Sequence, residues 1–366
     1  MFRVLSALAL FLAASPISFP RDHGSHPGSP VEWWYWTGHL SDRAGRAYGF
    51  QLTFFRARDL YLAHFAWTDV ARREFRYDEK THLGLPGIAS SAEGRLDLTN
   101  EDWIAREEPG GAQVIAANGR AGDLRLTLTP VKPPVLQGKG GLSKKGSGAN
   151  EFSHYVSITR LSATGTIRRG STRESLSGTA WFDHEWGPGV LPAGAAGWDW
   201  FALQLADGSD VMLYRIRRAD GSATPFSSGT FVPAKGAPTP IAWSGVRVTE
   251  TRFWRSPRTK ARYPAGWRIV VAGLDVEVLP LVADQELETP GSTGVTYWEG
   301  ACAVKGTRAG APITGRAYAE LTGYAGRDVP GMASSPPAAA WASSSAGSAT
   351  SPSPSFRRSG RNTSSP

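Results

Sequence analysis

The segment that decides the fold class is WDWFALQLADGSDVMLYRIRRADG (198–221). Apolar and aromatic residues run up to Asp207-Gly208 and resume directly after it, and a second Asp-Gly pair, Asp220-Gly221, ends the segment. An Asp-Gly pair between two such runs is a strong hairpin signal, because glycine reaches the positive φ angles that tight hairpin turns require. We therefore expect two antiparallel strands joined by a turn at Asp207-Gly208.

Similar short segments occur along most of the chain, from about Val31 to Tyr324. They are rich in aromatic and β-branched residues, and the clearest of them alternate between apolar and polar positions; they are 49–57, 61–70, 124–131, 154–167, 266–282, 296–306 and 313–324. No long stretch keeps a helical period with caps at both ends. We expect an all-β protein of two antiparallel barrels, at 19–190 and 191–326, with a long loop over 130–150.

The two ends of the chain differ from this pattern. A basic start, an apolar run over 4–14 that is too short to span a bilayer, and small residues after it predict a cleaved signal peptide over 1–18, although a buried N-terminal helix is the alternative. The signal peptide implies a periplasmic or secreted protein, with no transmembrane segment after cleavage. Residues 327–366 are rich in Ser, Ala and Pro and predict a disordered tail, native or out-of-frame.

Charge and cysteine content exclude several classes of protein. The formal net charge is +8, but the basic residues are spread through the strand-like segments, so we expect a mildly basic surface and no nucleic-acid partner. Cys302 is the single cysteine, so no intrachain disulfide can form. The oligomeric state is left open by these features.

An aromatic run lies in HPGSPVEWWYWTGHL (26–40). Because side chains of a strand alternate between its faces, Glu32, Trp34 and Trp36 are expected on one face, and Trp33 and Tyr35 on the other. A run that is apolar on both faces must be covered on both. One face is therefore expected to line a cavity for an apolar ligand, with plain barrel core as the alternative.

The segment richest in chemistry is GTAWFDHEWGPG (178–189). It places the ionisable groups Asp183, His184 and Glu185 between Trp181 and Trp186, with Asp183 and Glu185 on one face. Burial among aromatic rings raises the pKa of a carboxyl group and lets it hold a proton at neutral pH, which a general acid needs. The alternatives are a structural hydrogen-bond network or a surface turn.

Two further segments repeat the pairing of aromatic and acidic residues. They are GWDWF (197–201), with Trp198 and Trp200, and YWEGAC (297–302), with Tyr297, Trp298 and Glu299. Together with His64 of AHFAWTD (63–69), they complete the residues that we expect around one pocket.

Motifs for cofactors and metals are missing from the sequence. The histidines show no HExxH or Cys/His spacing, so the sequence predicts no metal site, although one assembled from distant residues remains open. The Gly- and Lys-rich segment 138–146 lacks the order of a phosphate-binding loop, and no GxSxG elbow supplies a nucleophilic serine. We expect no cofactor.

The same segments resemble a known family. FPRDHGSHPGSPVEWWYWTGHL (19–40), GTAWFDHEWG (178–187), GWDWFALQLADG (197–208), YWEGACAV (297–304) and AYAELTGY (317–324) occur in the order found in the AttH-like, carotenoid 1,2-hydratase (hydroxyneurosporene synthase) family. The resemblance implies two lipocalin-like (calycin) barrels. It also implies cofactor-independent addition of water to a carbon–carbon double bond, with the proposed acid of the family falling on Asp183.

The expected function follows from the residues and the resemblance together. It is an exported hydratase-like lyase that acts on a hydrophobic, isoprenoid-type substrate by acid catalysis. Asp183 is the expected acid, His184 or Glu185 orients it or takes a proton from water, and Trp34, Trp181 and Trp186 stabilise a carbocation. Two alternatives are a non-catalytic carrier of an apolar ligand and a secreted lipid or ester hydrolase.

Overall fold

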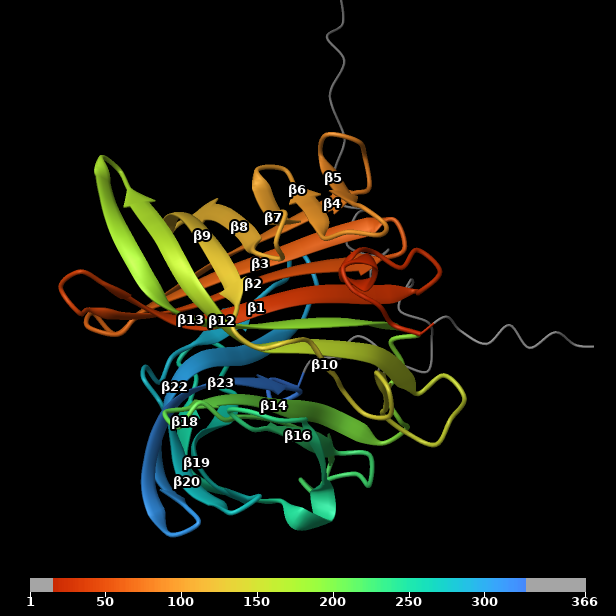
Figure 1. Cartoon of the computed structure of the whole chain (residues 1–366), viewed down its shortest axis with the longest axis vertical. Helices are drawn as coiled ribbons and strands as arrows, with labels where there is room; N and C mark the ends of the chain where they lie inside the picture. The colour runs from red at the N-terminus through yellow and green to blue at the C-terminus, as the bar shows by residue number, and fades with distance from the viewer. Residues whose placement is uncertain (1–15, 327–366) are drawn as a thin grey trace, which may run out of the picture.

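A computed structural model describes residues 16–326, so the expected signal peptide lies mostly, and the expected tail entirely, outside the described residues. The described chain is all-β and forms two antiparallel sheets, one above the other in Figure 1. One of the two sheets is a nearly closed barrel and the other a half-barrel. None of the helices among residues 16–326 is long and apolar enough to cross a membrane.

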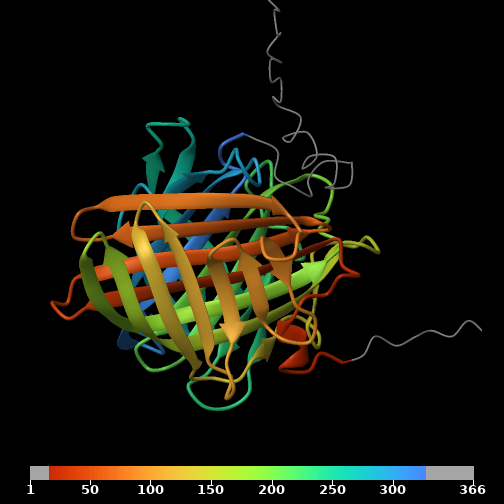
Figure 2. The same ribbon diagram turned by 90° about the horizontal axis from the view of Figure 1, so that it is seen from above.

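The first sheet contains thirteen strands and follows a short 3-10 helix, η1 (Arg21–His23). Its strands are β1 (Val31–Asp42), β2 (Ala47–Ala57), β3 (Leu60–Asp69), β4 (Glu74–Leu83), β5 (Ala89–Ser91), β6 (Asp97–Asn100), β7 (Trp103–Glu107), β8 (Gln113–Gly119), β9 (Gly122–Pro130), β10 (Val135–Leu136), β11 (Leu142–Lys144), β12 (Phe152–Arg169) and β13 (Thr172–Gly187). The order is β4-β3-β2-β1-β13-β12-β9-β8-β7-β6-β5, and β4 comes into contact with β6 as the sheet curls. Figure 2 shows the yellow strands lying across the orange ones.

The second sheet contains ten strands. They are β14 (Ala195–Leu205), β15 (Asp210–Arg218), β16 (Ser228–Val232), β17 (Thr239–Ala242), β18 (Arg247–Arg255), β19 (Arg262–Val271), β20 (Leu274–Pro280), β21 (Glu286–Glu288), β22 (Thr296–Arg308) and β23 (Ala311–Thr322). A 3-10 turn, η2 (Trp243–Gly245), connects the edge strands β17 and β18.

The hairpin predicted from 198–221 is present as β14 and β15, which pair antiparallel around a turn where Gly208 has φ +83°. The prediction of a long loop over 130–150 was correct for most of the segment but missed two short strands. Two short strands, β10 and β11, form there and pair with β12. They lack a visible sequence period because each is only two or three residues long.

Strand alternation gives each sheet an inner and an outer face. Trp34 and Trp36 of β1 lie in the interior of the first barrel, as does Phe182 of β13. Trp267 and Trp298 lie in the interior of the second sheet. The outer faces of the two sheets pack against each other.

The two outer faces approach closely. His39 Nε2 lies 2.8 Å from the carbonyl oxygen of Ala317, and the Thr68 hydroxyl donates to Gln285 Oε1 at 2.7 Å. A Cβ atom on Gly49 would lie 2.6 Å from Cβ of Ala301, so only glycine permits this approach of β2 to β22. The functional cavity forms where the faces separate.

Candidate active site

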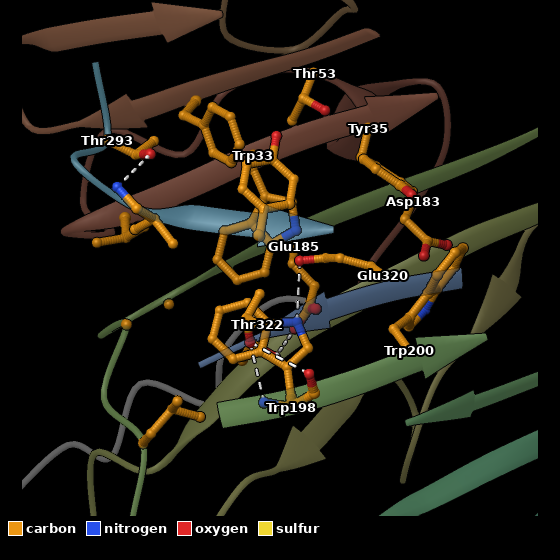
Figure 3. A pocket seen from close by; sticks show the side chains of 18 of the residues that line it. Trp33, Tyr35, Thr53, Asp183, Glu185, Trp198, Trp200, Thr293, Glu320 and Thr322 are labelled. Carbon is orange, nitrogen blue, oxygen red and sulfur yellow. Dashed lines mark hydrogen bonds between the residues drawn. The ribbon is translucent and has the colours of Figure 1, made fainter. Parts of the chain in front are cut away.

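A cavity of about 230 Å³ lies between the outer faces of the two sheets (Figure 3). Its lining is mostly aromatic and aliphatic, with contributions from both sheets. The aromatic members are Trp33, Tyr35, Phe55, Phe152, Tyr155, Trp198, Trp200, Tyr214 and Tyr297. Four carboxyl groups also line it, namely Asp183, Glu185, Glu299 and Glu320. An apolar cavity with a few converging polar groups is typical of a site for a small molecule.

Asp183, on β13, lines the cavity and is 3% exposed. Three donors reach its carboxyl group. The Ser157 hydroxyl and the Trp181 indole N–H donate to Oδ1 at 2.5 and 2.7 Å, and the Tyr155 hydroxyl donates to Oδ2 at 2.6 Å. Trp200 donates in turn to the Tyr155 hydroxyl at 3.0 Å, which fixes that tyrosine in place.

These contacts determine where Asp183 holds its proton. Burial raises the pKa of Asp183 to about 7, although the three hydrogen bonds act to lower the pKa and Glu185 acts to raise it. The Trp181 indole can only donate, so Oδ1 remains an acceptor. The proton therefore belongs on Oδ2, at the oxygen shared with Tyr155.

An ion pair lies beside this acid. Glu185 follows Asp183 on the same face of β13, and Lys145 Nζ lies 3.1 Å from Glu185 Oε2, which also accepts from the Ser153 hydroxyl. Although burial acts to lower it, the pKa of Lys145 is raised by the Glu185 carboxylate. The ammonium group also lies 4.3 Å from the ring centre of Tyr214. This arrangement keeps Glu185 paired with a cation next to a group that holds a proton.

Two more carboxyl groups face the cavity from the second sheet. Glu299 of β22 and Glu320 of β23 lie directly opposite each other across the strand pair. Tyr35 donates to Glu299, and Trp198 Nε1 donates to Glu320 Oε1 at 3.1 Å. Burial raises the pKa of both, for Glu320 to about 8 and for Glu299 well above its ordinary value, and mutual repulsion adds to the effect on Glu299. Both groups therefore retain protons at neutral pH.

His64 closes the cavity on the side of the first sheet. Its Nδ1 lies 2.7 Å from the Tyr297 hydroxyl and its Nε2 lies 2.8 Å from the Ser292 hydroxyl. Burial lowers the pKa of His64 to about 3, so the ring is neutral. It positions Tyr297 rather than transferring protons at neutral pH.

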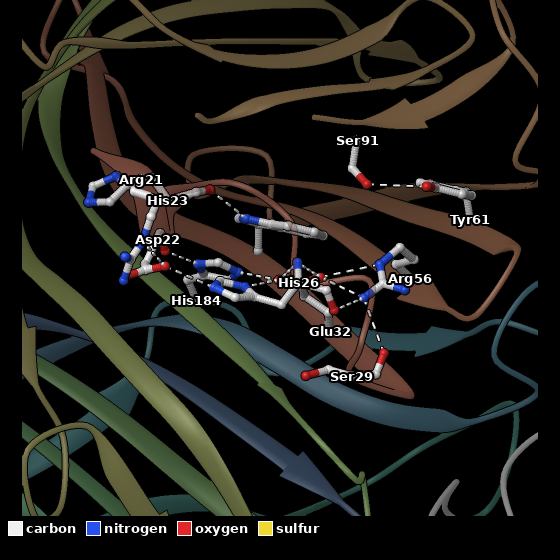
Figure 4. A network of polar contacts seen from close by, with 11 residues as sticks. Arg21, Asp22, His23, His26, Ser29, Glu32, Arg56, Tyr61, Ser91 and His184 are labelled. Atoms are coloured by element: carbon white, nitrogen blue, oxygen red, sulfur yellow. Dashed lines mark hydrogen bonds and ion pairs between the residues drawn. The ribbon is translucent and has the colours of Figure 1, made fainter. Parts of the chain in front are cut away.

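A second polar cluster lies on the opposite face of β1 and β13 (Figure 4). His184 Nε2 and His26 Nδ1 lie 2.9 and 2.7 Å from Glu32 Oε1, and Arg56 donates to Glu32 Oε2 at 2.8 Å. Burial acts to raise the pKa of Glu32, but its bonds to the two histidines hold it at about 2. Burial lowers the pKa of His184 to about 4, despite the opposing effect of Glu32. His26, Glu32 and His184 do not line the cavity, whereas Arg56 contributes to its lining.

Comparisons with known proteins identify relatives of the chain. The AttH-like family model matches residues 11–324. The chain belongs to the AttH-like family. A crystal structure of an AttH protein from Nitrosomonas europaea is 37% identical with a TM-score of 0.79, and the match covers 85% of this chain and 98% of that one.

A more distant neighbour of this AttH-like protein is the crystal structure of kievitone hydratase from Nectria haematococca. It is 16% identical with a TM-score of 0.69, and the match covers 85% of this chain and 94% of that one. This similarity shows that the two proteins share a fold. No curated protein matches the chain.

The structure of the AttH-like protein divides the residues expected around the pocket into two groups. Those that line the cavity are Trp33, Tyr35, His64, Asp183, Glu185, Trp198, Trp200, Tyr297 and Glu299. Those that do not are Glu32, Trp34, Trp36, Trp181, His184, Trp186 and Trp298.

The expectation of one pocket for all of them therefore needs correction. Glu32, Trp34, Trp36, His184 and Trp186 occupy alternate positions of β1 and β13, which point away from the cavity. Trp298 alternates in the same way on β22 and lies inside the second sheet. Trp181 lies on the same face of β13 as Asp183, but behind the Asp183 carboxyl group, to which its indole N–H donates.

Several residues of the cavity were missed from the sequence. Tyr155 of the lining lies in HYVSITRL (154–161), and alternation places Ser157, which donates to Asp183 without lining the cavity, on the same face of the strand. Glu320 lies in AYAELTGY (317–324). This segment contributed to the family resemblance, but its glutamate was not considered as a site residue. Lys145 lies in the Gly- and Lys-rich segment 138–146, which was considered only as a phosphate-binding loop.

Replacing Tyr155 with Phe is expected to raise the pKa of Asp183 by about one to two units. The variant loses a hydrogen bond that favours the ionised carboxyl group, and such bonds to charged groups contribute about 1.5–3 kcal/mol. Infrared spectroscopy of the protonated carboxyl band across a pH titration measures the shift. Tyr214→Phe is the control, because Tyr214 lines the cavity and bonds to Ser143 and Lys144 but not to Asp183. A carboxyl band that titrates at the same pH in the Tyr155→Phe variant and the unaltered protein would contradict the assignment.

Proposed function

We propose that this AttH-like protein is a hydratase that adds water to a carbon–carbon double bond of an apolar, isoprenoid-type molecule, with Asp183 as the proton donor. The position of Asp183 carries the proposal. It faces an aromatic cavity, is almost fully buried, and has a pKa of about 7. A general acid works best when its pKa lies near the working pH.

The proposed hydration needs only a water molecule and the acidic groups that line the cavity. The proton on Asp183 Oδ2 passes to one alkene carbon, whose new C–H bond takes the π electron pair, and a tertiary cation forms on the other carbon. The oxygen of a water molecule bonds to that cation, and the proton that it sheds passes to Glu185. Transfer of this proton to Asp183 through cavity water restores the acid, and the net change is the addition of one water molecule.

The cation is stabilised by aromatic faces of the cavity. Trp33 and Tyr35 from the first sheet and Trp198 and Trp200 from the second take this role, in place of the tryptophans expected from the sequence. His184 takes no part, because it lies on the far face of β13. The rings also exclude bulk water, which would otherwise capture the cation unselectively.

A carrier of an apolar ligand would not need four buried carboxyl groups. Burying such groups is costly unless they are paired or protonated, so a lining that contains four of them favours a catalytic site. The fold shared with a protein named kievitone hydratase adds support. We also propose that the protein is exported to the periplasm or secreted, on the basis of its N-terminal sequence.

The cavity limits the size of the substrate. The volume of about 230 Å³ lies a little below the range of about 300–1,000 Å³ that is typical of pockets for small molecules. We therefore expect a small isoprenoid, such as a C15 compound, or the terminal part of a longer one.

The proposal is tested by incubating the protein with an acyclic C15 isoprenoid alcohol in water enriched in ¹⁸O. Mass spectrometry is expected to find a tertiary alcohol that carries the label, at a rate proportional to protein concentration. Reactions without protein and in unlabelled water are the controls. Recovery of a bound but unchanged isoprenoid, across a panel of chain lengths, would favour the carrier and contradict the proposal.

The rate of hydration is expected to fall as the pH rises. Asp183 must be protonated to act, and its pKa in the folded protein is about 7, so kcat/KM is expected to be level well below pH 7, to be half its maximum near pH 7 and to fall about tenfold per unit well above it. Initial rates of ¹⁸O incorporation between pH 5 and about 9 measure the profile. A rate that rises through this range would rule out a protonated carboxyl group as the acid.

A further inference from the structure

Three side chains of the polar cluster in Figure 4 converge on one point, away from the proposed catalytic cavity. His26, Glu32 and His184 each bring a ligand atom within 4.8 Å of the other two. Glu32 Oε1 is the shared centre, at 2.7 Å from His26 Nδ1 and 2.9 Å from His184 Nε2. Glu32 and His184 are buried, and the His26 ring stacks on Trp186 with 3.8 Å between ring centres.

The other polar atoms of His26, Glu32 and His184 have hydrogen-bond partners of their own. His184 Nδ1 lies 3.1 Å from the carbonyl oxygen of Asp22, and His26 Nε2 lies 3.2 Å from Asp22 Oδ1. Arg56 donates to Glu32 Oε2. Histidines that bind a metal through one nitrogen commonly donate from the other to a backbone carbonyl or a carboxylate, and their carboxylate partners are themselves hydrogen-bonded.

The hydrogen-bonding capacity of the two rings favours a bound cation. A neutral imidazole carries one N–H group and one lone pair. In both His26 and His184, each of the two nitrogens faces an oxygen that accepts, so either tautomer of a neutral ring leaves a lone pair against an acceptor. If each ring donates to Asp22, the lone pairs of His26 Nδ1 and His184 Nε2 point at Glu32 Oε1. A cation among these three atoms removes the conflict.

We propose that His26, Glu32 and His184 bind one divalent transition-metal ion of the Zn²⁺ class. Two imidazoles and a carboxylate suit such ions, which bind these ligands at about 2.0–2.2 Å. Adjacent ligand atoms at such bond lengths lie about 3 Å apart, close to the distances between Glu32 Oε1 and each ring. Water fills the remaining positions on the side of His26, which is half-buried.

The ion would attach the N-terminal segment to the first barrel. His26 follows η1, whereas Glu32 of β1 and His184 of β13 lie on the same face of these paired strands, two residues out of register. A metal bond therefore links the segment to the strand that carries Asp183, without entering the cavity. This site is independent of the proposed hydratase reaction.

The test uses the full chain without a polyhistidine tag, stripped with a chelator and titrated with Zn²⁺. Native mass spectrometry and calorimetry are expected to find one zinc per chain. Zinc at about a hundred times its dissociation constant is expected to raise Tm by about 5 °C. Glu32→Gln and His26→Gln are expected to lose the bound zinc and the rise in Tm, whereas His82→Gln, at a half-buried histidine of β4 paired with Glu101, retains both.

A measurement on the unaltered protein keeps the test decisive if a variant does not fold. Imidazole ¹⁵N NMR of the zinc-loaded protein is expected to show His26 Nδ1 and His184 Nε2 without protons. Two doubly protonated rings that do not respond to zinc would overturn the proposal. So would binding that survives Glu32→Gln and His26→Gln but is lost with His82→Gln.

Discussion

Replacing Asp183 with Asn is expected to lower kcat/KM for hydration by about 10²- to 10⁴-fold, the usual contribution of a general acid. The amide has the shape of the carboxyl group but no acidic proton. Its oxygen can still accept from Ser157 and Trp181, and its NH₂ group can donate to the Tyr155 hydroxyl, so the surrounding network is retained. Initial rates of ¹⁸O incorporation measure the loss, and binding of the same isoprenoid, followed by tryptophan fluorescence, is expected to persist.

A matched control separates this effect from the loss of any aspartate. Asp275→Asn removes an exposed carboxylate of β20 that pairs with Arg268, remote from the cavity lining. Its rate is expected to equal that of the unaltered protein. If Asp183→Asn retained full activity with the same pH profile, Asp183 would not be the acid.

The sequence predicted the fold because strand alternation and turns are local properties. The Asp207-Gly208 turn was correctly located, and the alternation of Trp33, Trp34 and Tyr35 was correct by face. Alternation separates the two faces of a strand, but it does not reveal which part of the protein packs against each face. The face of Trp34 proved to be barrel interior, and the face of Trp33 and Tyr35 lines the cavity.

The site was less accessible from the sequence because it forms between two sheets. Its walls combine β13 with β22 and β23, segments more than a hundred residues apart, and no local pattern reports that approach. The DHE triplet illustrates this limit. Asp183 and Glu185 face the cavity, whereas His184 between them joins a separate cluster with Glu32 and His26.

Replacing Asp210 with Ala is expected to destabilise the protein by about 3–5 kcal/mol, the usual result of removing one partner of a buried ion pair. Asp210, at the start of β15 in the second sheet, is fully buried. It accepts from Thr159 and Arg160 of β12 at 2.9 and 2.5 Å, and Lys132 Nζ lies 2.6 Å from its Oδ2. One carboxylate of the second sheet thus binds two cations, one from β12 of the first sheet and one from the loop between β9 and β10.

The large effect follows from what the alanine variant leaves behind. The side chains of Lys132 and Arg160 are only 9% and 17% exposed, so both cations remain largely out of water without their anion. Asp207→Ala, in the same hairpin, removes a carboxylate that is 35% exposed and pairs with Arg308, and such pairs contribute about 0–1 kcal/mol. Urea unfolding followed by tryptophan fluorescence compares the two variants. Equal losses of unfolding free energy would mean that Asp210 does not hold the two sheets together, and that the apolar contact between their outer faces is sufficient.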